Sequence, residues 1–279
     1  MKSAANKIFI NKSILFPVVF LLFLFFLALC MPLISPYSDD LKGAVHFEVG
    51  PTPPSLAHWF GTDIAGRDIF TLTAYASLSS LKVAIGSIFI SVLIGVPLGV
   101  VAGLEKGWID EVIMRMTDGF LAFPPLILPI TITAILGPSL NNVMIGIAIS
   151  WFPWYARIAR SQALIISETD YVSVSRCFGA TKYHIIKNHI VPNGINPVII
   201  QATIDAGYAI LMSSGLSFIG LGSQPPDVEW GLLITQSRAQ FLSYWWVVLF
   251  PGLFIVFSVF SFNLIGDGLR STLGPQSKF

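Results

Sequence analysis

The chain has 279 residues, of which 54% are hydrophobic and only 11% are charged, and its mean hydropathy is +0.76. Soluble domains carry roughly 25% charged residues, so this composition excludes a soluble enzyme, a disordered chain and a nucleic-acid binder. A formal net charge of +1 provides no overall electrostatic field that would attract polyanions. Two cysteines are too few for a disulfide scaffold or a cysteine-built zinc module. The class that remains is an integral membrane protein.

Six apolar stretches are long enough to cross a bilayer, which takes about 20 mostly apolar residues. We expect each to be a helix, because the strands of a β-barrel would be shorter and alternating. The first stretch is longer than the apolar core of a signal peptide and precedes no small-x-small cleavage site, so we expect it to be retained as an anchor. The expected spans are 14–34, 83–104, 119–136, 137–156 (with its helix starting near Asn142), 194–218 and 245–265.

Glycines and prolines make two of these spans irregular. Gly95, Gly99 and Gly103 are four residues apart, so they share one helix face and allow another helix to approach closely. That helix belongs either to this chain or to a second subunit. In the third span, a proline pair and a further proline predict a bent helix: these are Pro124, Pro125 and Pro129.

Lysine and arginine are distributed asymmetrically between the connecting segments. With the N-terminus inside, twelve of the sixteen basic residues lie on the inner side, so six spans with both termini cytoplasmic is the expected topology. It divides the chain into a cytoplasmic N-terminus (1–13), a first transmembrane helix (14–34), an extracytoplasmic segment (35–82), a transmembrane core (83–274) with a long inner loop (157–193), and a C-terminal tail (275–279).

The inner loop carries two short helices that meet at a glycine. A helical pattern runs from Tyr171 to Phe178, and Gly179 stands where a helix C-terminal stop belongs. Thr181 can cap a second short helix, which we expect Pro192 to close. The apolar residues of this loop either pack on the membrane ends of the same chain or dock into the groove of a partner.

Asp205 is the one charged residue in the apolar stretch 194–218. A carboxylate at the centre of a span costs about 2.5–3.5 kcal/mol on insertion scales, so its side chain is expected to face the interior or water. One hypothesis makes it a pore-lining acid that meets a cationic solute. The other makes it a structural acid, hydrogen-bonded to Ser or Thr on a neighbouring span.

The four histidines do not predict a metal site. His46 and His58 fall on the outer side of the expected topology, whereas His184 and His189 fall on the inner side. The inner pair is five residues apart, so we do not expect the two rings to share a helix face. A lone histidine is poor evidence for a metal site, and we predict none.

Three ordered motifs point to a family. Ser173-Val174-Ser175, Gly179 and Pro192 resemble the cytoplasmic "EAA" loop of ABC-importer permeases, in which a small-residue triplet, a glycine and a proline have this spacing. The stretch His58-Trp-Phe-Gly-Thr-Asp-Ile-Ala-Gly-Arg-Asp68 resembles the outer-loop signature of the second permease in the dipeptide/oligopeptide/nickel family. Two later stretches resemble its C-terminal signatures, and the resemblance runs from about residue 14 to 274: they are 216–226 and 262–270.

The resemblance implies an all-α membrane protein with the ABC type I importer permease fold, in a bacterial inner (plasma) membrane. It also implies three kinds of protein partner: a second permease that completes the pore, two cytoplasmic ATPases that hold ATP and Mg, and an extracytoplasmic solute-binding protein. The sequence has no Gly-x4-Gly-Lys-Ser/Thr loop for phosphates. We therefore expect no enzymatic activity and no cofactor in this chain.

The resemblance assigns roles to two groups of residues. Residues of the inner loop would couple the pore to an ATPase: Ser173, Val174, Ser175, Phe178, Gly179, Ala180 and Thr181. Residues of the outer motif would form a tight turn held by charge pairing, which acts either as a structural staple or as a docking surface for the binding protein: His58, Gly61, Thr62, Asp63, Gly66, Arg67 and Asp68.

The family divides by cargo. Ala202–Asp205 followed by Ser213–Ser217 resembles the nickel branch, whereas peptide-branch members commonly have an acidic residue near the position of Ser213. The chain is also short, as nickel-branch members tend to be. We therefore expect nickel or a metal chelate as the solute, with di- or oligopeptides as the alternative.

Two other classes of membrane protein are alternatives to the permease. A stand-alone secondary transporter would need inverted repeats or several buried charges. A membrane-embedded enzyme would need at least two polar catalytic groups at one depth.

Overall fold

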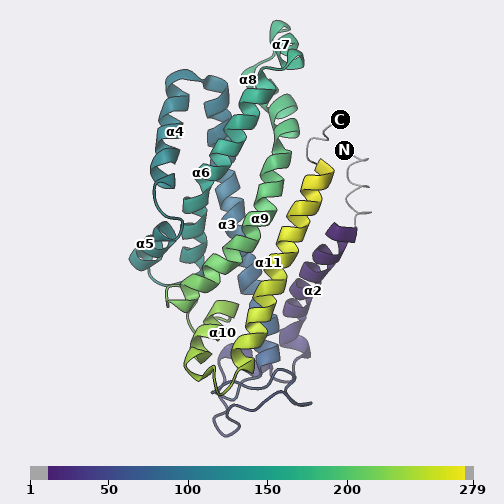
Figure 1. Ribbon diagram of the computed structural model, residues 1–279, viewed down its shortest axis with the longest axis vertical. Helices are drawn as coiled ribbons and strands as arrows, with labels where there is room; N and C mark the ends of the chain where they lie inside the picture. Colours follow the sequence, from purple (N-terminus) through teal and green to yellow (C-terminus); the bar gives the residue numbers. More distant parts are fainter. Residues whose placement is uncertain (1–11, 274–279) are drawn as a thin grey trace.

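The computed structural model describes residues 12–273, and the regular secondary structure in that range is helical (Figure 1). The predicted tail 275–279 lies outside the described residues, as does the predicted N-terminal segment 1–13 apart from its last two residues. The elements in chain order are α2 (Lys12–Ile34), η1 (Ser38–Lys42), α3 (Ile69–Glu105), α4 (Gly107–Leu121), α5 (Ile127–Leu136), α6 (Leu140–Ser167), α7 (Asp170–Cys177), α8 (Lys182–Ile185), the π-helical η2 (Ile186–Ile190), α9 (Val191–Phe218), α10 (Trp230–Ser237), η3 (Arg238–Gln240) and α11 (Trp246–Leu273).

Five of the six expected spans fall on single long helices, namely α2, α3, α6, α9 and α11. Within the described range 12–273, four helical runs are long and apolar enough to cross a membrane by themselves. Helix α6 has the length, with 28 residues, but two asparagines and two arginines lower its hydropathy. The apolar runs are 14–34, 69–105, 182–218 and 246–273.

The third expected span, 119–136, is not one helix. Helix α4 ends at Leu121, and α5 begins at Ile127. Pro124 and Pro125 occupy the connection, where proline removes a backbone donor and disfavours helix in the residue before it. The ten residues of α5 rise only about 15 Å, so the return pass is made of two short helices. The prolines predict a bend, and the structure has a full break.

Two helices extend well beyond their expected ends. Helix α3 begins at Ile69 rather than near residue 83, and α6 continues to Ser167 inside the predicted inner loop. The early part of α3 carries Ser and Thr residues that are buried against neighbouring elements, so hydropathy alone does not mark it as helix. With 37 residues, α3 rises about 55 Å, which exceeds the hydrocarbon thickness of about 30 Å.

The glycine stripe of α3 packs against α6 of the same chain. A Cβ atom built on Gly99 would lie 2.9 Å from the Cβ of Ala159, and one built on Gly103 would lie 2.8 Å from the Cβ of Ala163. Gly95 meets α6 in the same way. The intrachain alternative is therefore confirmed for these three glycines.

The ends of the bundle are arranged as the predicted topology requires. Figure 1 shows that α2 begins and α11 ends at the end of the bundle that carries α7 and α8. The segment between α2 and α3 lies at the opposite end. The inner loop, the start of α2 and the end of α11 thus share one side of the bundle. The assignment of that side to the cytoplasm stays a prediction.

We expect Gly99→Ala to lower the free energy of unfolding by about 1–3 kcal/mol, because the added methyl group overpacks the contact between α3 and α6. The measurement is the thermal unfolding midpoint of the purified permease in detergent. Gly252→Ala in α11 is the matched control, since a Cβ there meets nothing within 4 Å. Equal midpoints for the two variants would contradict the close α3–α6 packing.

Candidate functional site

The predicted inner-loop motif forms a helical corner at one end of the bundle. Helix α7 covers Asp170–Cys177, and Gly179 follows with φ +81°, a left-handed conformation that glycine adopts without a steric penalty. The Thr181 side chain accepts a hydrogen bond of 3.2 Å from the backbone nitrogen of His184 and so caps α8. The glycine stop and the threonine cap are confirmed.

The apolar residues of this corner divide between two faces. Val172 and Ile185 are buried against the ends of the long helices. Phe178 is 88% exposed and Tyr183 is 71% exposed. Packing on the same chain is therefore confirmed for Val172 and Ile185. Phe178 and Tyr183 present large apolar side chains outward, and their docking into a partner stays a prediction.

The predicted end of the second short helix is wrong. Pro192 lies in the first turn of α9, and the chain runs as one continuous helix from Lys182 to Phe218. Residues 186–190 form a π-helical turn within it, and π-turns occur as local insertions inside α-helices. Helix α8 is thus continuous with α9.

The π-helical turn also overturns the expectation for the inner histidines. His184 and His189 do share a face, with ring centroids 5.9 Å apart. The hydrogen bonding of a π-turn joins residues five apart, which places them one above the other. Within residues 12–273, no group of three or more His, Cys, Asp or Glu side chains is arranged to hold a metal ion.

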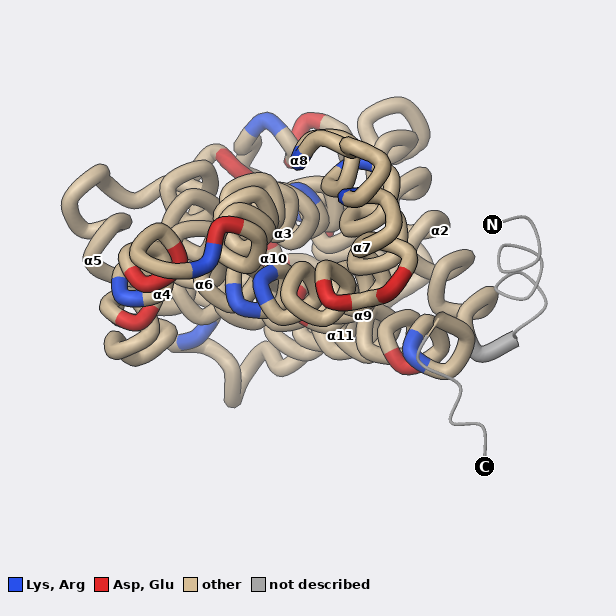
Figure 2. Tube along the Cα trace, turned by 90° about the horizontal axis from the view of Figure 1, so that it is seen from above, with Lys and Arg blue, Asp and Glu red and all other residues tan. Residues whose placement is uncertain are grey.

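Ion pairs tie this corner to the adjoining helices. Lys182 of α8 lies 2.7 Å from Glu105 at the end of α3, and Lys106 lies 3.2 Å from Glu168 just before α7. Figure 2 views the molecule from this end and shows acidic and basic segments on α4, α6 and α8. These pairs are largely exposed, so each stabilises the fold by only about 0–1 kcal/mol. They hold the connection between α3 and α4 against α8 on one side and against the segment just before α7 on the other.

A further pair of ionic contacts fastens α4 to α6. Arg160 contacts Asp110 through two hydrogen bonds, with Nε–Oδ1 and Nη2–Oδ2 distances of 2.5 and 2.6 Å. Arg157 lies 2.5 Å from Asp118. Bidentate arginine–carboxylate pairs are among the stronger charge-assisted contacts, so α4, the first half of the broken third pass, is held to α6 by charged residues.

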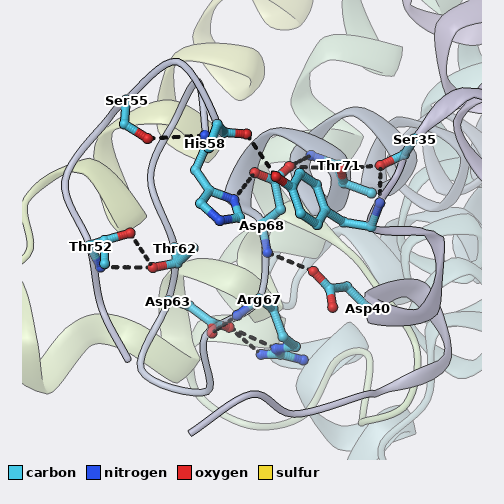
Figure 3. Close-up of polar contacts among 12 residues, drawn as sticks. Ser35, Asp40, Thr52, Ser55, His58, Thr62, Asp63, Arg67, Asp68 and Thr71 are labelled. Atoms are coloured by element: carbon cyan, nitrogen blue, oxygen red, sulfur yellow. Dashed lines mark hydrogen bonds and ion pairs between the residues drawn. The ribbon is translucent and has the colours of Figure 1, made fainter. Parts of the chain in front are cut away.

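At the opposite end, the outer motif forms the expected tight turn (Figure 3). The carboxylate of Asp63 accepts hydrogen bonds from the backbone nitrogens of Ala65 and Arg67, at 2.8 and 2.9 Å, and from Arg67 Nε at 2.7 Å. Gly66 has φ +75°, and a Cβ there would collide with the backbone of His46. Arg67 also donates to Gln236 in α10 at 3.0 Å, which links the turn to a distant part of the chain.

Asp68 plays a different part from Asp63. Its Oδ2 accepts hydrogen bonds from the backbone nitrogen and the hydroxyl of Thr71, at 2.8 and 2.7 Å, and so caps α3. Its Oδ1 lies 2.9 Å from His58 Nδ1, and its backbone nitrogen donates to Asp40 at 2.7 Å. Asp40 also contacts His46 at 3.0 Å. Sequence reasoning missed Asp40, because no motif spacing connects it to Asp68.

Asp205 lies halfway along α9 and faces α6. The hydroxyl of Tyr155 donates to Asp205 Oδ2 at 2.7 Å, and Gln201 Nε2 donates to Oδ1 at 2.9 Å. The partners are thus a tyrosine and a glutamine rather than the expected Ser or Thr. Asp205 also lines a cavity of about 600 Å³, together with Trp151 and other residues.

Comparison with known proteins decides the family. Residues 95–278 match the model of "Binding-protein-dependent transport system inner membrane component". The chain belongs to this family. Its fold is that of the permease subunits of ABC importers, which form a membrane pore and are not enzymes in themselves.

The relatives and structural neighbours agree with this assignment. The probable D,D-dipeptide transport system permease protein DdpC of Escherichia coli K12 is 42% identical over 252 residues, covering 90% of this chain and 85% of that protein. The dipeptide transport system permease protein DppC of Alkalihalophilus pseudofirmus is 42% identical over 250 residues, covering 88% and 82%. An inward-facing structure of the MetNI methionine ABC transporter matches with a TM-score of 0.60 at 20% identity, covering 73% of this chain and 97% of that one.

These findings reverse the expected order of cargoes. The expectation of nickel or a metal chelate is not supported, since the relatives named above are dipeptide permeases. Ser213, on which that expectation partly rests, is buried and does not line the cavity beside Asp205. Its identity therefore does not report on a solute in that cavity.

We expect Asp68→Ala to destabilise the permease by about 2–3 kcal/mol, because it removes the cap of α3 and leaves the partners of the carboxylate unsatisfied. The thermal unfolding midpoint of the purified protein measures the loss. Asp39→Ala is the matched control, since the Asp39 side chain is exposed and pairs only with an exposed lysine. An unchanged midpoint for Asp68→Ala would mean that the network in Figure 3 contributes nothing to stability.

Proposed function

We propose that this chain is the pore-forming subunit of an ATP-driven importer of dipeptides or other short peptides. The peptide class is supported by the names of its 42%-identical relatives from Escherichia coli and Alkalihalophilus pseudofirmus. The observation that carries the coupling mechanism is the helical corner at Phe178 and Gly179, which offers an exposed apolar surface to a partner. Membership of the family supports a second permease, two ATP-binding subunits and an extracytoplasmic binding protein as partners.

The proposed coupling is mechanical. The corner around Gly179, including the small residues Ser173, Val174, Ser175, Ala180 and Thr181, fits into a cleft of an ATPase. Closure of the two ATPases on ATP moves this corner. The continuous helix from Lys182 onward carries the motion about 35 Å to the level of Asp205, and the pore alternates between its two openings.

For the outer motif we propose a structural role. Its charged groups are turned inward, since the Asp63 and Asp68 side chains are only 4% and 3% exposed. A docking surface would need such groups in solvent. The motif instead joins the start of α3 to α10 through Arg67 and Gln236, so it holds the extracytoplasmic end of the bundle in shape beneath a binding protein.

Gly179→Asp and Phe178→Ala should each abolish or strongly reduce transport while leaving the permease in the membrane. The aspartate places a charge and a strained backbone at the corner, and the alanine removes the most exposed apolar side chain there. Uptake and ATPase co-purification are measured in a strain that lacks the chromosomal gene. Phe16→Ala is the matched control, because Phe16 is 74% exposed on α2 at a distance from the corner. Normal ATP-driven uptake by Gly179→Asp would remove the coupling proposal.

The cargo is tested by complementing the deletion strain with the wild-type gene and supplying a labelled dipeptide or labelled nickel. We expect the gene to restore dipeptide uptake and to leave nickel uptake unchanged. A Gly179→Asp copy serves as the inactive control for both solutes. Restored uptake of nickel alone would reject the peptide assignment and leave the permease assignment intact.

A further inference from the structure

A cavity of about 600 Å³ opens beside the middle of α9. It lies between α9, α6 and the broken connection from α4 to α5, and Trp151, Trp154 and Tyr208 contribute aromatic walls. Its volume lies in the range of about 300–1,000 Å³ that is typical of sites for small molecules. The lining is mostly apolar, and Asp205 is the one charged residue in it.

The carboxylate of Asp205 has two hydrogen-bond donors but no counter-ion among the residues that the structure describes. The Gln201 amide nitrogen donates to one oxygen and the Tyr155 hydroxyl donates to the other, so each oxygen accepts one hydrogen bond. Within residues 12–273, no Lys, Arg or His forms an ion pair with Asp205. A partly buried charge without a partner is costly, and each oxygen retains room for a further donor.

The geometry of Tyr155 supports a fixed position for this carboxylate. Tyr155 is fully buried, and its Cβ lies 2.8 Å from the position that a Cβ on Gly95 of α3 would take. Its hydroxyl therefore holds the carboxylate from the rigid part of the bundle. A carboxylate that served only to join α6 to α9 would not need a cavity on its open side.

We infer that Asp205, with the aromatic walls of this cavity, forms a transient subsite for the N-terminal ammonium group of a peptide in transit. This inference rests on the proposed function and names the chemical group that the permease itself recognises. The ammonium supplies the missing positive charge and donates to both carboxylate oxygens, while the aromatic rings attract cations through their faces. A single carboxylate binds weakly, as conduction requires.

The test uses the complete transporter in proteoliposomes, with Cys30 and Cys177 replaced by serine because both are exposed. Leu211→Cys places one thiol at the cavity, since Leu211 lines it, is exposed and is not one of its aromatic walls. The rate at which N-ethylmaleimide labels this introduced thiol is measured without the binding protein, in the presence of dialanine or N-acetyl-dialanine. The two peptides differ at the N-terminal ammonium, which acetylation removes.

We expect dialanine, at about ten times its dissociation constant, to slow the labelling of the introduced thiol about tenfold. N-acetyl-dialanine should not slow it. Asp205→Asn should abolish the protection and lower the turnover of dialanine uptake about tenfold, whereas Asp205→Glu should retain protection. Asp39→Asn is the matched control, because it removes an exposed carboxylate far from the cavity.

Three results would overturn the inference while leaving peptide transport intact. If dialanine protected the introduced thiol equally in the Asp205→Asn background, Asp205 would be a structural acid. If N-acetyl-dialanine protected the introduced thiol as well as dialanine does, recognition of the ammonium group would be excluded. If the introduced thiol were unreactive both with and without peptide, another subunit would cover the cavity. A wild-type transporter that takes up no dialanine at all would instead reject the proposed function.

Discussion

The close packing of α3 on α6 is the contact on which the rest of the structure depends. Three glycines four residues apart remove the side chains that would separate the two helices. Without a hydrophobic force between helices in lipid, such close van der Waals contact is a main source of association. The contact sets the position of α6, which carries Tyr155 toward Asp205 and Arg160 toward Asp110. Both the cavity and the broken third pass are therefore positioned by it.

The two ends of the bundle differ in how their charged groups are buried. At the end with α7 and α8, the two ion pairs that flank the loop, Lys106–Glu168 and Lys182–Glu105, are largely exposed and individually weak, and large apolar side chains face outward. This is the surface that we propose as the docking site for an ATPase. At the other end, carboxylates are buried and their hydrogen bonds are satisfied by backbone nitrogens, hydroxyls and histidines. Buried networks of this kind favour one conformation, so this end is built to be rigid.

The question of cargo shows how a pattern can mislead. The lack of an acidic residue at Ser213 favours nickel by pattern alone, yet Ser213 faces the interior of the bundle. Asp205 lies about two helical turns away on α9, and it is the residue that lines a cavity. A sequence position near a motif does not reveal which way its side chain points, because residues eight apart on a helix differ by about 80° in direction.

The sequence alone determined the class, the order of the passes and the helical corner at Gly179. Long apolar stretches must be helical in a membrane because every backbone polar group needs an internal partner, and Gly179 and Thr181 carry local stop and cap signals that need no tertiary context. Only the tertiary structure decided the break between Leu121 and Ile127, the continuous helix through Pro192, and the link from Asp40 to Asp68. Pro124 and Pro125 signal a bend locally, but they do not say whether the helix bends or breaks. That outcome, like the other two features, depends on how distant segments pack against one another, and such long-range contacts leave no periodic signal in the chain.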